Sequence, residues 1–588
     1  MSAIRSIWPW LRPYWRYGAG AFMAMIVSVV INLSIPLLTS RIIDDGIAQD
    51  DGSFVLRLAL TMVGLIIAGM AASAVASVMG VRLAFNTVTD LRRDVYAKTQ
   101  TFSFGNLDEL TSGEILTRLS SDMTKVTMLL SMGLSFIAQI PIMFIGALGA
   151  IVLIDASLVV IVLVMLPAIG ILVGYTISQS NVLYDAVQRR IDRLNTVLQE
   201  NIQGAEVIKA FVRQDHETER FNEVADDLAD QAAKVNQLVA SLFPTLTVIS
   251  AMGISAVIWL GGGNVIDGTL TDGQLVAFIS YMALVTMPMM MFAFLQPMIS
   301  AATASMSRIN EIFGTVPAIS FVANGTDLAD QTNPGDIEFD DVSFRYSSRA
   351  ATTEAEMALC NVSFRIKAGT TVAILGATGS GKSTLVHLIP RLYDTTTGTV
   401  RVGGVNVREL TKRSLRRNIG IALQQPELFS GTVADNLRFG RPDATDDQMI
   451  AAATAAQAHD FITAMADGYD SVIQQTGANL SGGQRQRLAI ARTLLLEPAI
   501  LILDDSTSAV DLETEAHIQL AFDKLTDTTV VLVAQRISTA LGADEIIVLD
   551  EGGVAAHGSH DELLQSSAIY QDIYRSQLGD AVDVGQAL

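Results

Sequence analysis

The stretch Gly376-Ala377-Thr378-Gly379-Ser380-Gly381-Lys382-Ser383 decides the fold of the second half of this chain. An apolar run, 371–375, precedes it, and Thr384 opens a helical pattern after it. Glycines in such a strand-loop-helix setting let successive backbone N–H groups turn inward around a phosphate. Lys382 is expected to hold the β- and γ-phosphates of a nucleotide, and Ser383 is expected to ligate Mg²⁺. The stretch therefore predicts an α/β domain with a nucleotide site.

Two further motifs lie downstream of this loop. The apolar run 499–503 ends in Asp504 and Asp505, and a strand end beside the phosphate loop is where a Mg²⁺-organising carboxylate belongs. Asp504 is the candidate. The sequence Leu480-Ser481-Gly482-Gly483-Gln484 opens a helix with Ser481 as its N-cap, and its glycines leave N–H groups free for an anion. Because the first loop already supplies one phosphate cradle, this motif predicts contact with a second nucleotide.

The composition of the whole chain indicates a membrane protein. Of its 588 residues, 50% are apolar and 17% are charged, and the mean hydropathy is +0.40, which excludes a disordered chain and disfavours an ordinary soluble enzyme. Six uncharged stretches approach or exceed the roughly 20 residues that cross a bilayer as a helix. We expect spans at about 17–40, 58–81, 134–154, 157–178, 239–262 and 274–298.

The distribution of charge orients these spans. Residues 1–320 hold 19 Lys/Arg and 25 Asp/Glu, and residues 321–588 hold 20 and 35, so the net charge of −21 lies mostly in the second half. This acidity argues against a nucleic-acid partner. Basic residues gather near the N-terminus and in the long segments after spans two and four, so the positive-inside rule predicts that both termini and these segments are cytoplasmic. The single cysteine, Cys360, excludes a disulfide scaffold.

Each long cytoplasmic segment contains a short apolar knot, one near 102–112 and one near 204–211, which could dock another domain. A solvated hairpin tip is the alternative for each knot. We expect four parts in the chain. They are a transmembrane domain over 1–320, a linker over 321–335, the nucleotide-binding domain over 336–578 and a tail over 579–588.

The chain resembles the ATP-binding cassette (ABC) exporters over nearly its whole length. The matching motifs are Walker A at 376–383, the Q-loop at Gln424, the LSGGQ signature at 480–484, Walker B at 500–504, the D-loop Ser508-Ala509-Val510-Asp511, and Tyr346 as the aromatic that stacks on adenine. The resemblance implies an α-helical six-span transmembrane domain followed by an α/β P-loop nucleotide-binding domain with a helical subdomain. It implies ATP and Mg²⁺ as cofactors, the metal being held by Ser383, Gln424 and Asp504, and it makes the two knots coupling helices.

The resemblance also implies an assembly. Six spans and one cassette make half a transporter, so the family pattern implies a second half-transporter, with each ATP held between Walker A of one chain and the signature of the other. The uncharged spans argue against a buried ion relay and favour a small apolar or amphipathic cargo, such as drugs, lipids or peptides. We expect a multi-pass protein of a bacterial plasma membrane, in contact with the lipid bilayer.

Two positions depart from the family pattern. The family places Glu after the Walker B Asp, whereas this chain has Asp505, whose carboxylate is one methylene shorter. The family's switch histidine is replaced by Gln535, which cannot become cationic or shuttle a proton. With an intact signature, these changes predict the degenerate half of a heterodimeric exporter. The alternatives are a homodimeric exporter with slow ATPase, an importer with the exporter fold, and a non-transporting ATP-binding regulator.

Overall fold

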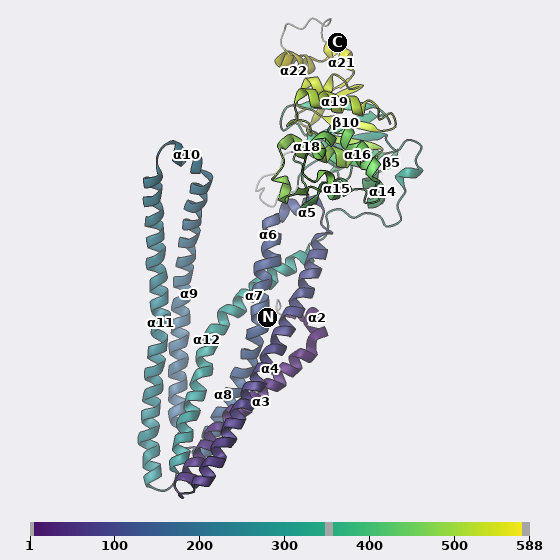
Figure 1. Ribbon diagram of the computed structural model, residues 1–588. Coiled ribbons are helices and arrows are strands. Elements are labelled where there is room, and N and C mark those ends of the chain that lie inside the picture. The colour runs from purple at the N-terminus through teal and green to yellow at the C-terminus, as the bar shows by residue number, and fades with distance from the viewer. Residues whose placement is uncertain (1–4, 347–356, 579–588) are drawn as a thin grey trace. The chain divides into compact units, whose positions relative to one another are not determined.

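The computed structural model describes residues 5–346 and 357–578, apart from the side chains of 134–135, 287–294, 296, 512 and 578. It divides into two compact units, one of Met1–Gln100 with Gly113–Thr315 and one of Thr101–Ser112 with Val316–Leu588 (Figure 1). The expected tail, 579–588, lies outside the described residues.

The first unit is built of long helices (Figure 1). Four of them have between 43 and 53 residues, about twice the roughly 20 residues with which a helix crosses a bilayer. Its helices are α2 (Trp8–Leu11), η1 (Arg12–Tyr14), α3 (Trp15–Arg41), η2 (Ile42–Ile47), α4 (Gly52–Thr99), α6 (Ser112–Thr117), η3 (Arg118–Asp122), α7 (Met123–Met128), η4 (Leu129–Gly133), α8 (Leu134–Ile154), α9 (Val159–Gln203), α10 (Ala205–Ala210), α11 (Gln214–Ile266) and α12 (Asp272–Gly314).

Among the described residues, five stretches are long and apolar enough to cross a membrane. A shorter apolar helix, Asp272–Thr286, is the beginning of α12. The sixth expected span, 274–298, therefore stays a prediction. The five stretches are Trp8–Ile47, Gly52–Thr99, Ser112–Ile154, Val159–Gln203 and Gln214–Ile266.

A carboxylate ties the first and last long helices together at one end of this unit. Asp44, just after α3, accepts hydrogen bonds from the Thr271 hydroxyl at 2.7 Å and from the backbone N–H of Gly273 at 2.8 Å. A Cβ on Gly273 would lie 2.3 Å from the carbonyl oxygen of Ser40, so only glycine permits this approach. Thr271 in turn caps α12 through the N–H of Gln274.

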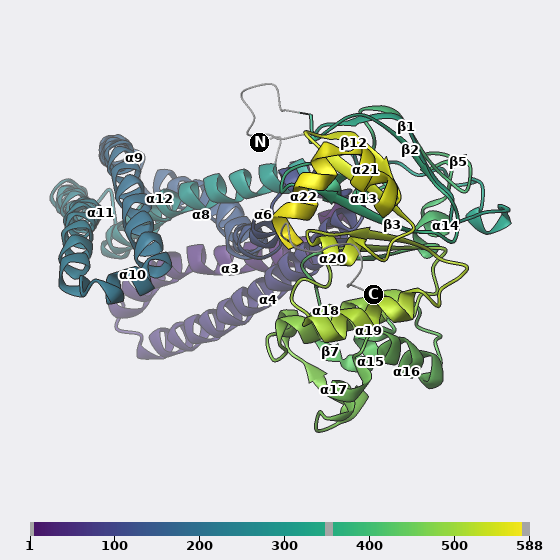
Figure 2. The same ribbon diagram turned by 90° about the horizontal axis from the view of Figure 1, so that it is seen from above.

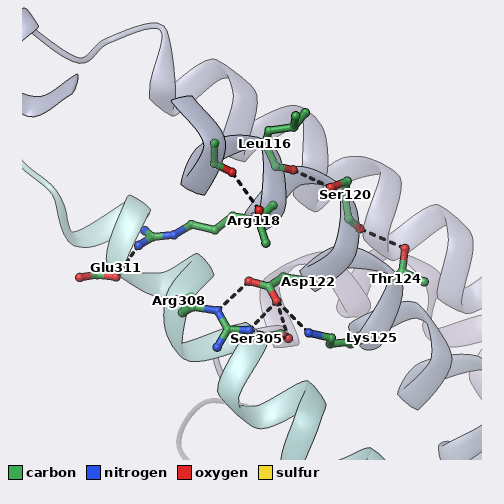
Figure 3. Close-up of polar contacts among 11 residues, drawn as sticks. Leu116, Arg118, Ser120, Asp122, Thr124, Lys125, Ser305, Arg308 and Glu311 are labelled. Carbon is green, nitrogen blue, oxygen red and sulfur yellow. Dashed lines mark hydrogen bonds and ion pairs between the residues drawn. The ribbon is translucent and has the colours of Figure 1, made fainter. Parts of the chain in front are cut away.

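Nearer the other end of α12, a buried ionic cluster joins it to η3 and α7 (Figure 3). The Asp122 carboxylate is fully buried and accepts hydrogen bonds from the Ser305 hydroxyl and from Nε of Arg308, each at 2.8 Å. One turn away, Arg118 pairs with Glu311 at 2.8 Å. Arg118 and Asp122 of η3 thus contact three positions of α12, namely 311, 308 and 305. These contacts fix the register of η3 against α12.

The second unit is an α/β domain whose six-stranded sheet has the order β12-β11-β3-β10-β9-β6, and only β12 is antiparallel to its neighbour. A second sheet has the order β2-β1-β4-β5 and a third pairs β7 with β8. The strands are β1 (Ile337–Phe344), β2 (Leu359–Ile366), β3 (Thr371–Gly376), β4 (Thr397–Val402), β5 (Val405–Asn406), β6 (Ile419–Ala422), β7 (Gly431–Thr432), β8 (Val472–Ile473), β9 (Ile500–Asp504), β10 (Thr529–Val533), β11 (Glu545–Asp550) and β12 (Gly553–Gly558).

Helices cover both faces of the parallel sheet, which explains why its strands read as continuous apolar runs. On β9, Ile500 and Ile502 join the core that includes β1 and β2, whereas Leu501 and Leu503 join a core formed with α15, α16 and α18. Figure 2 shows the part with α15–α17 at the opposite end of this unit from β1 and β2. The helices are α5 (Phe104–Glu109), η5 (Leu328–Asp330), α13 (Lys382–Leu388), α14 (Lys412–Arg417), α15 (Val433–Leu437), α16 (Asp446–Ala455), α17 (His459–Thr463), η6 (Gly468–Asp470), η7 (Gln475–Gly477), α18 (Gly482–Leu494), α19 (Leu512–Phe522), α20 (Ile537–Ala540), α21 (His560–Ser566) and α22 (Ala568–Leu578).

The short helix α5 belongs to this second unit, although we expected residues 1–320 to form one domain. Asn106 is buried there, and its side-chain amide donates to the carbonyl oxygen of Val316 at 3.1 Å and accepts from the N–H of Ala318 at 2.9 Å. The Tyr393 hydroxyl donates to the Asp108 carboxylate at 2.9 Å. These contacts attach the first knot to the α/β domain and place the division of the chain at residues 315 and 316.

Candidate nucleotide site

Strand order brings the expected site residues to one edge of the sheet. After β3 and its loop, α13 begins at Lys382; β9 ends at Asp504, Gln535 follows β10, and Gln424 follows β6. These four strands are parallel neighbours, so their carboxyl ends meet at the same edge, which is where ligands bind in open α/β sheets. The edge carries a cavity of about 340 Å³ lined by Tyr346, Ala358, Thr378, Gly379, Gly381, Lys382, Ser383, Thr384, Gln424, Asp504, Asp505, Val533 and Gln535.

The phosphate loop depends on glycine for its conformation. Gly379 and Gly381 have φ values of +88° and +98°, in the left-handed region that side chains disfavour. A Cβ on Gly381 would also lie 2.6 Å from the carbonyl oxygen of Ala358. The Lys382 ammonium donates to the carbonyl oxygens of Gly376 and Ala377, each at 2.8 Å. Burial lowers the pKa of Lys382, and the carboxylates beside it oppose that shift.

The two acids after β9 have different partners. Asp504 is buried and accepts a hydrogen bond from the Ser383 hydroxyl at 3.0 Å. Asp505 accepts hydrogen bonds from the side-chain amides of Gln424 at 3.1 Å and Gln535 at 2.8 Å, both to the same carboxylate oxygen. Burial raises the pKa of each carboxyl group, and the hydrogen bonds from Ser383 and Gln424 oppose the shift.

These oxygens fit Mg²⁺ in part. Ser383 and Asp504 supply a hydroxyl and a carboxylate side by side, and Mg²⁺ is usually bound through one or two carboxylates together with substrate phosphates. Consistent with this mode, the described residues contain no group of three His, Cys, Asp or Glu side chains that could hold a metal alone. Gln424, the third expected ligand, has its amide nitrogen on Asp505 instead.

Tyr346 lies at the side of the cavity, within a cluster of aromatic rings. Its hydroxyl is hydrogen-bonded to the Thr384 hydroxyl at 2.9 Å, and its ring meets those of Phe344 and Tyr393 edge to face, with centroids 4.8 and 5.2 Å apart. No local sequence pattern indicates a role for Tyr393 or for His387, which lies beside it. The His387 ring stacks on Tyr393 and its Nε2 lies 3.8 Å from Asp504. The aromatic cluster therefore links the cavity to Asp108 on α5.

The signature residues lie apart from this cavity, at the start of α18. The Ser481 hydroxyl caps the helix by accepting a hydrogen bond from the N–H of Gln484 at 3.2 Å. The side-chain oxygen of Gln484 in turn accepts from the N–H of Ser481 at 2.9 Å. Leu480 is buried beneath the cap, while Gly482 and Gly483 lie against Ala509. None of the five lines the cavity that holds Lys382.

The D-loop is fixed to the signature helix rather than to the phosphate loop. Gln486 on α18 accepts from the N–H of Ala509 at 2.9 Å and donates to the Ser508 hydroxyl at 3.3 Å. Val510 is buried, and Asp511 caps α19 through the N–H of Thr514 at 2.9 Å. Sequence reasoning missed Gln486, although it lies only two residues after the signature.

Comparison with known proteins agrees with this arrangement. Residues 19–289 match the family model described as the ABC transporter transmembrane region, and residues 359–508 match the one described as ABC transporter. An uncharacterized ABC transporter ATP-binding protein of Bacillus subtilis, YfiB, is 37% identical over 97% of this chain and 98% of its own. A putative multidrug export ATP-binding/permease protein of the same organism, YgaD, is 33% identical over 98% of this chain and 100% of its own.

A solved structure extends the match to the whole fold. The structure of a bacterial Atm1-family ABC exporter with ATP bound has a TM-score of 0.79 and 26% sequence identity, and the alignment covers 97% of this chain and 99% of that one. The helical unit, the phosphate loop at the sheet edge and the separate signature helix are the parts that such a fold requires. The chain belongs to the ABC transporter family and is an exporter half-transporter, with a membrane-embedded helical domain followed by one ATP-binding domain.

Proposed function

We propose that this chain is the degenerate-site subunit of a heterodimeric exporter. The observation that carries the proposal is the pair Asp505 and Gln535, which lie within hydrogen-bonding distance of each other while the signature motif is intact. In this arrangement the chain binds ATP at its own Walker motifs and turns it over slowly. Its signature residues complete the rapid site of the partner.

The residues of the cavity divide the work of nucleotide binding. The backbone N–H groups of 376–384 and the Lys382 ammonium hold the phosphates, and Tyr346 lies beside the adenine. Ser383 and Asp504 hold Mg²⁺, and Gln424 joins them when its amide leaves Asp505. When bound, Mg²⁺ neutralises charge that develops on the transferred phosphoryl group.

The slow turnover follows from the geometry of Asp505. Its carboxylate is one methylene shorter than that of Glu, and a displacement of about 1 Å from an attacking water can lower a rate roughly a hundredfold. Both amides bind the same oxygen of this carboxylate, so Gln535 positions it but supplies no positive charge. The site is therefore suited to holding ATP.

Exposed apolar side chains support assembly with a second half-transporter. At the tip formed by α10, Val207, Phe211 and Val212 are 60%, 74% and 78% exposed. In the cassette, Phe429 and Phe439 stack on each other with centroids 4.5 Å apart, and both are exposed. Because soluble surfaces rarely leave such groups uncovered, these two patches fit sites that a partner chain covers.

The cargo proposed for this exporter is a small apolar or amphipathic compound, carried out of the cytoplasm of a bacterial cell. A cavity of about 270 Å³ lies between α9, α11 and α12, and sulfur and hydroxyl side chains line it without any charge. Methionine side chains repack around varied ligands. The name of the relative YgaD, a putative multidrug export protein, points to the same class. The cavity residues that carry this reading are Met165, Thr247, Ser250, Met282 and Thr286.

The decisive test is ATP hydrolysis by the purified pair of half-transporters. Replacing the partner's catalytic Glu by Gln should remove most of the activity, whereas Asp505→Asn in this chain should leave most of it. Ser481→Ala is expected to slow the pair as well, since it alters the signature that faces the partner's nucleotide. Full activity after the partner's change, or rapid hydrolysis by this chain alone, would refute the proposal.

Two further readouts separate the alternatives. If the exporter is a homodimer, this chain should purify as a dimer of identical subunits and hydrolyse ATP slowly at both sites. In inside-out vesicles, ATP-dependent uptake of an apolar dye supports export, ATP-dependent loss of preloaded dye supports import, and ATP binding without flux supports a regulator.

A further inference from the structure

The N-terminal segment is held by hydrogen bonds to α4 and α12. The indole N–H of Trp10 donates to Asp94 at 2.7 Å, and the Tyr14 hydroxyl donates to Asp90 at 2.7 Å. The two donors are four residues apart, and so are the two acceptors. One turn of the segment therefore lies against one turn near the end of α4. The Ser6 hydroxyl accepts from Asn310 on α12 at 2.7 Å, which secures the beginning of the segment.

Other side chains of this segment line a large apolar cavity. Ile7, Trp8 and Leu11 belong to its wall, and the cavity of about 920 Å³ also contacts the first turns of α3 and α8 and an inner part of α4. Its volume is within the range of small-molecule sites, about 300–1,000 Å³. The remaining wall is built of Gly18, Ala21, Phe22, Met25, Gly80, Leu83, Leu130, Ile137 and Ala138.

The cavity has one charged lining residue, Arg5, among the residues described, and no acidic one. Arg12 and Arg16 are exposed a few residues further along the chain, whereas Asp94 and Asp90 accept hydrogen bonds from Trp10 and Tyr14. Trp8 and Trp15 are 59% and 58% exposed, as expected of indoles at the depth of lipid headgroups. An apolar chamber with a cation at its polar end fits an amphiphile that has an anionic head.

We propose that this chamber is a binding site for an acidic glycerophospholipid of the cytoplasmic leaflet. The acyl chains occupy the space between α3, α4 and α8, and the phosphate pairs with the Arg5 guanidinium. The walls come from the ends of the first three expected spans that face the cytoplasm, where anionic lipids attract basic segments. The proposal rests on the proposed membrane orientation, but not on the heterodimer or on the degenerate site.

Native mass spectrometry of the purified full-length assembly, without nucleotide, tests this proposal. We expect one phosphatidylglycerol per copy of this chain to be retained in preference to phosphatidylcholine. Arg5→Gln should reduce that preference about fivefold, which corresponds to about 1 kcal/mol, whereas Arg5→Lys keeps most of it. Ala21→Phe, which fills the chamber, should reduce retention of both lipids. Arg57→Gln, an exposed arginine at the other end of α4, is the matched control.

Several outcomes would overturn the proposal. The first is equal retention of the two lipids, and the second is an unchanged preference in Arg5→Gln. The third is protection of the chamber by the partner chain in place of lipid. The fourth is displacement of the bound lipid by a transported dye, which would make the chamber a cargo site. ATP binding by each variant, measured separately, shows that the protein is folded. Lipid retention is measured without ATP hydrolysis, so failure of this proposal can be distinguished from failure of the proposed function.

Discussion

At the scale of single residues, Asp505 has a φ of +47°, a left-handed conformation that Asp adopts more readily than most residues. In this conformation its carboxylate lies between the amides of Gln424 and Gln535. Residue 505 is therefore both the position of the missing family Glu and the centre of a polar cluster. The chemistry of this chain's own nucleotide site depends on how far that carboxylate reaches.

Restoring the family residues should restore turnover at this site. In an assembly whose partner site is inactivated by its own Glu→Gln change, we expect Asp505→Glu combined with Gln535→His to raise ATP hydrolysis by at least about tenfold, because the carboxylate regains about 1 Å of reach. Steady-state phosphate release measures the effect. Adding Lys382→Ala should abolish the gain, and a double variant no faster than its parent would contradict the explanation.

The raised pKa of Asp505 predicts how stability depends on pH. A carboxyl group whose pKa is raised by folding stabilises the protein below its ordinary pKa, and this contribution is lost as the pH rises through the raised value. Asp505→Asn should therefore raise the melting temperature of the nucleotide-free protein at pH 7 by about 2 °C. The difference should disappear below about pH 4, where the residue 505 side chain is uncharged in the folded and in the unfolded protein. Asp561→Asn, which removes an exposed aspartate from α21, is the matched control for the change in charge.

At the scale of elements, the cluster around Asp122 holds the extension of α12 against η3 and α7. The carboxylate is fully buried and has charged or hydroxyl partners on both of its oxygens, so its removal leaves the buried Ser305 hydroxyl without this acceptor (Figure 3). The cluster therefore joins η3 and α7 to α12 through charged and hydroxyl groups.

Asp122→Ala should destabilise the helical unit by about 2–3 kcal/mol, the range for hydrogen bonds to charged groups. We expect faster amide hydrogen exchange in 117–128, with ATP binding unchanged. Asp226→Ala, which removes an exposed acid from α11, provides the control. Equal exchange in the two variants would show that the register does not depend on Asp122.

The sequence predicted the nucleotide site better than it predicted the contacts between distant elements. The phosphate loop, the acid-ended strand and the capped signature helix are local patterns, and parallel strand order alone brings their residues together. The bond between Asp108 and Tyr393 joins residues 285 apart, and no periodicity indicates it. The direction of the Gln424 amide likewise depends on Asp505, which sequence spacing does not describe.

At the scale of the whole molecule, the orientation of the chain in the membrane depends on the number of spans. Five stretches satisfy the length and hydropathy of a span among the described residues, and α12 is needed as the sixth to return the chain to its starting side. With an odd number of spans, the N-terminus and the cassette would lie on opposite sides.

Cysteine labelling can decide this, because Cys360 is the only cysteine of the chain. In a Cys360→Ser background, we expect Asp50→Cys and Asp267→Cys to react with an impermeant maleimide in intact cells. Asp215→Cys should react only after the membrane is opened. Reaction of Cys360 itself from outside, in the otherwise unaltered protein, would contradict both the six-span arrangement and a cytoplasmic cassette.

The attachment of α5 to the cassette has a consequence for exchanging parts between transporters. Asn106 and Asp108 are encoded more than two hundred residues before their partners Val316, Ala318 and Tyr393, yet they belong to one compact unit. A chimera that transplants only the C-terminal portion severs these bonds and leaves a foreign helix against the new surface. A graft that is to inherit its donor's communication with the membrane must carry two separate pieces of the gene, 101–112 and 316 onward.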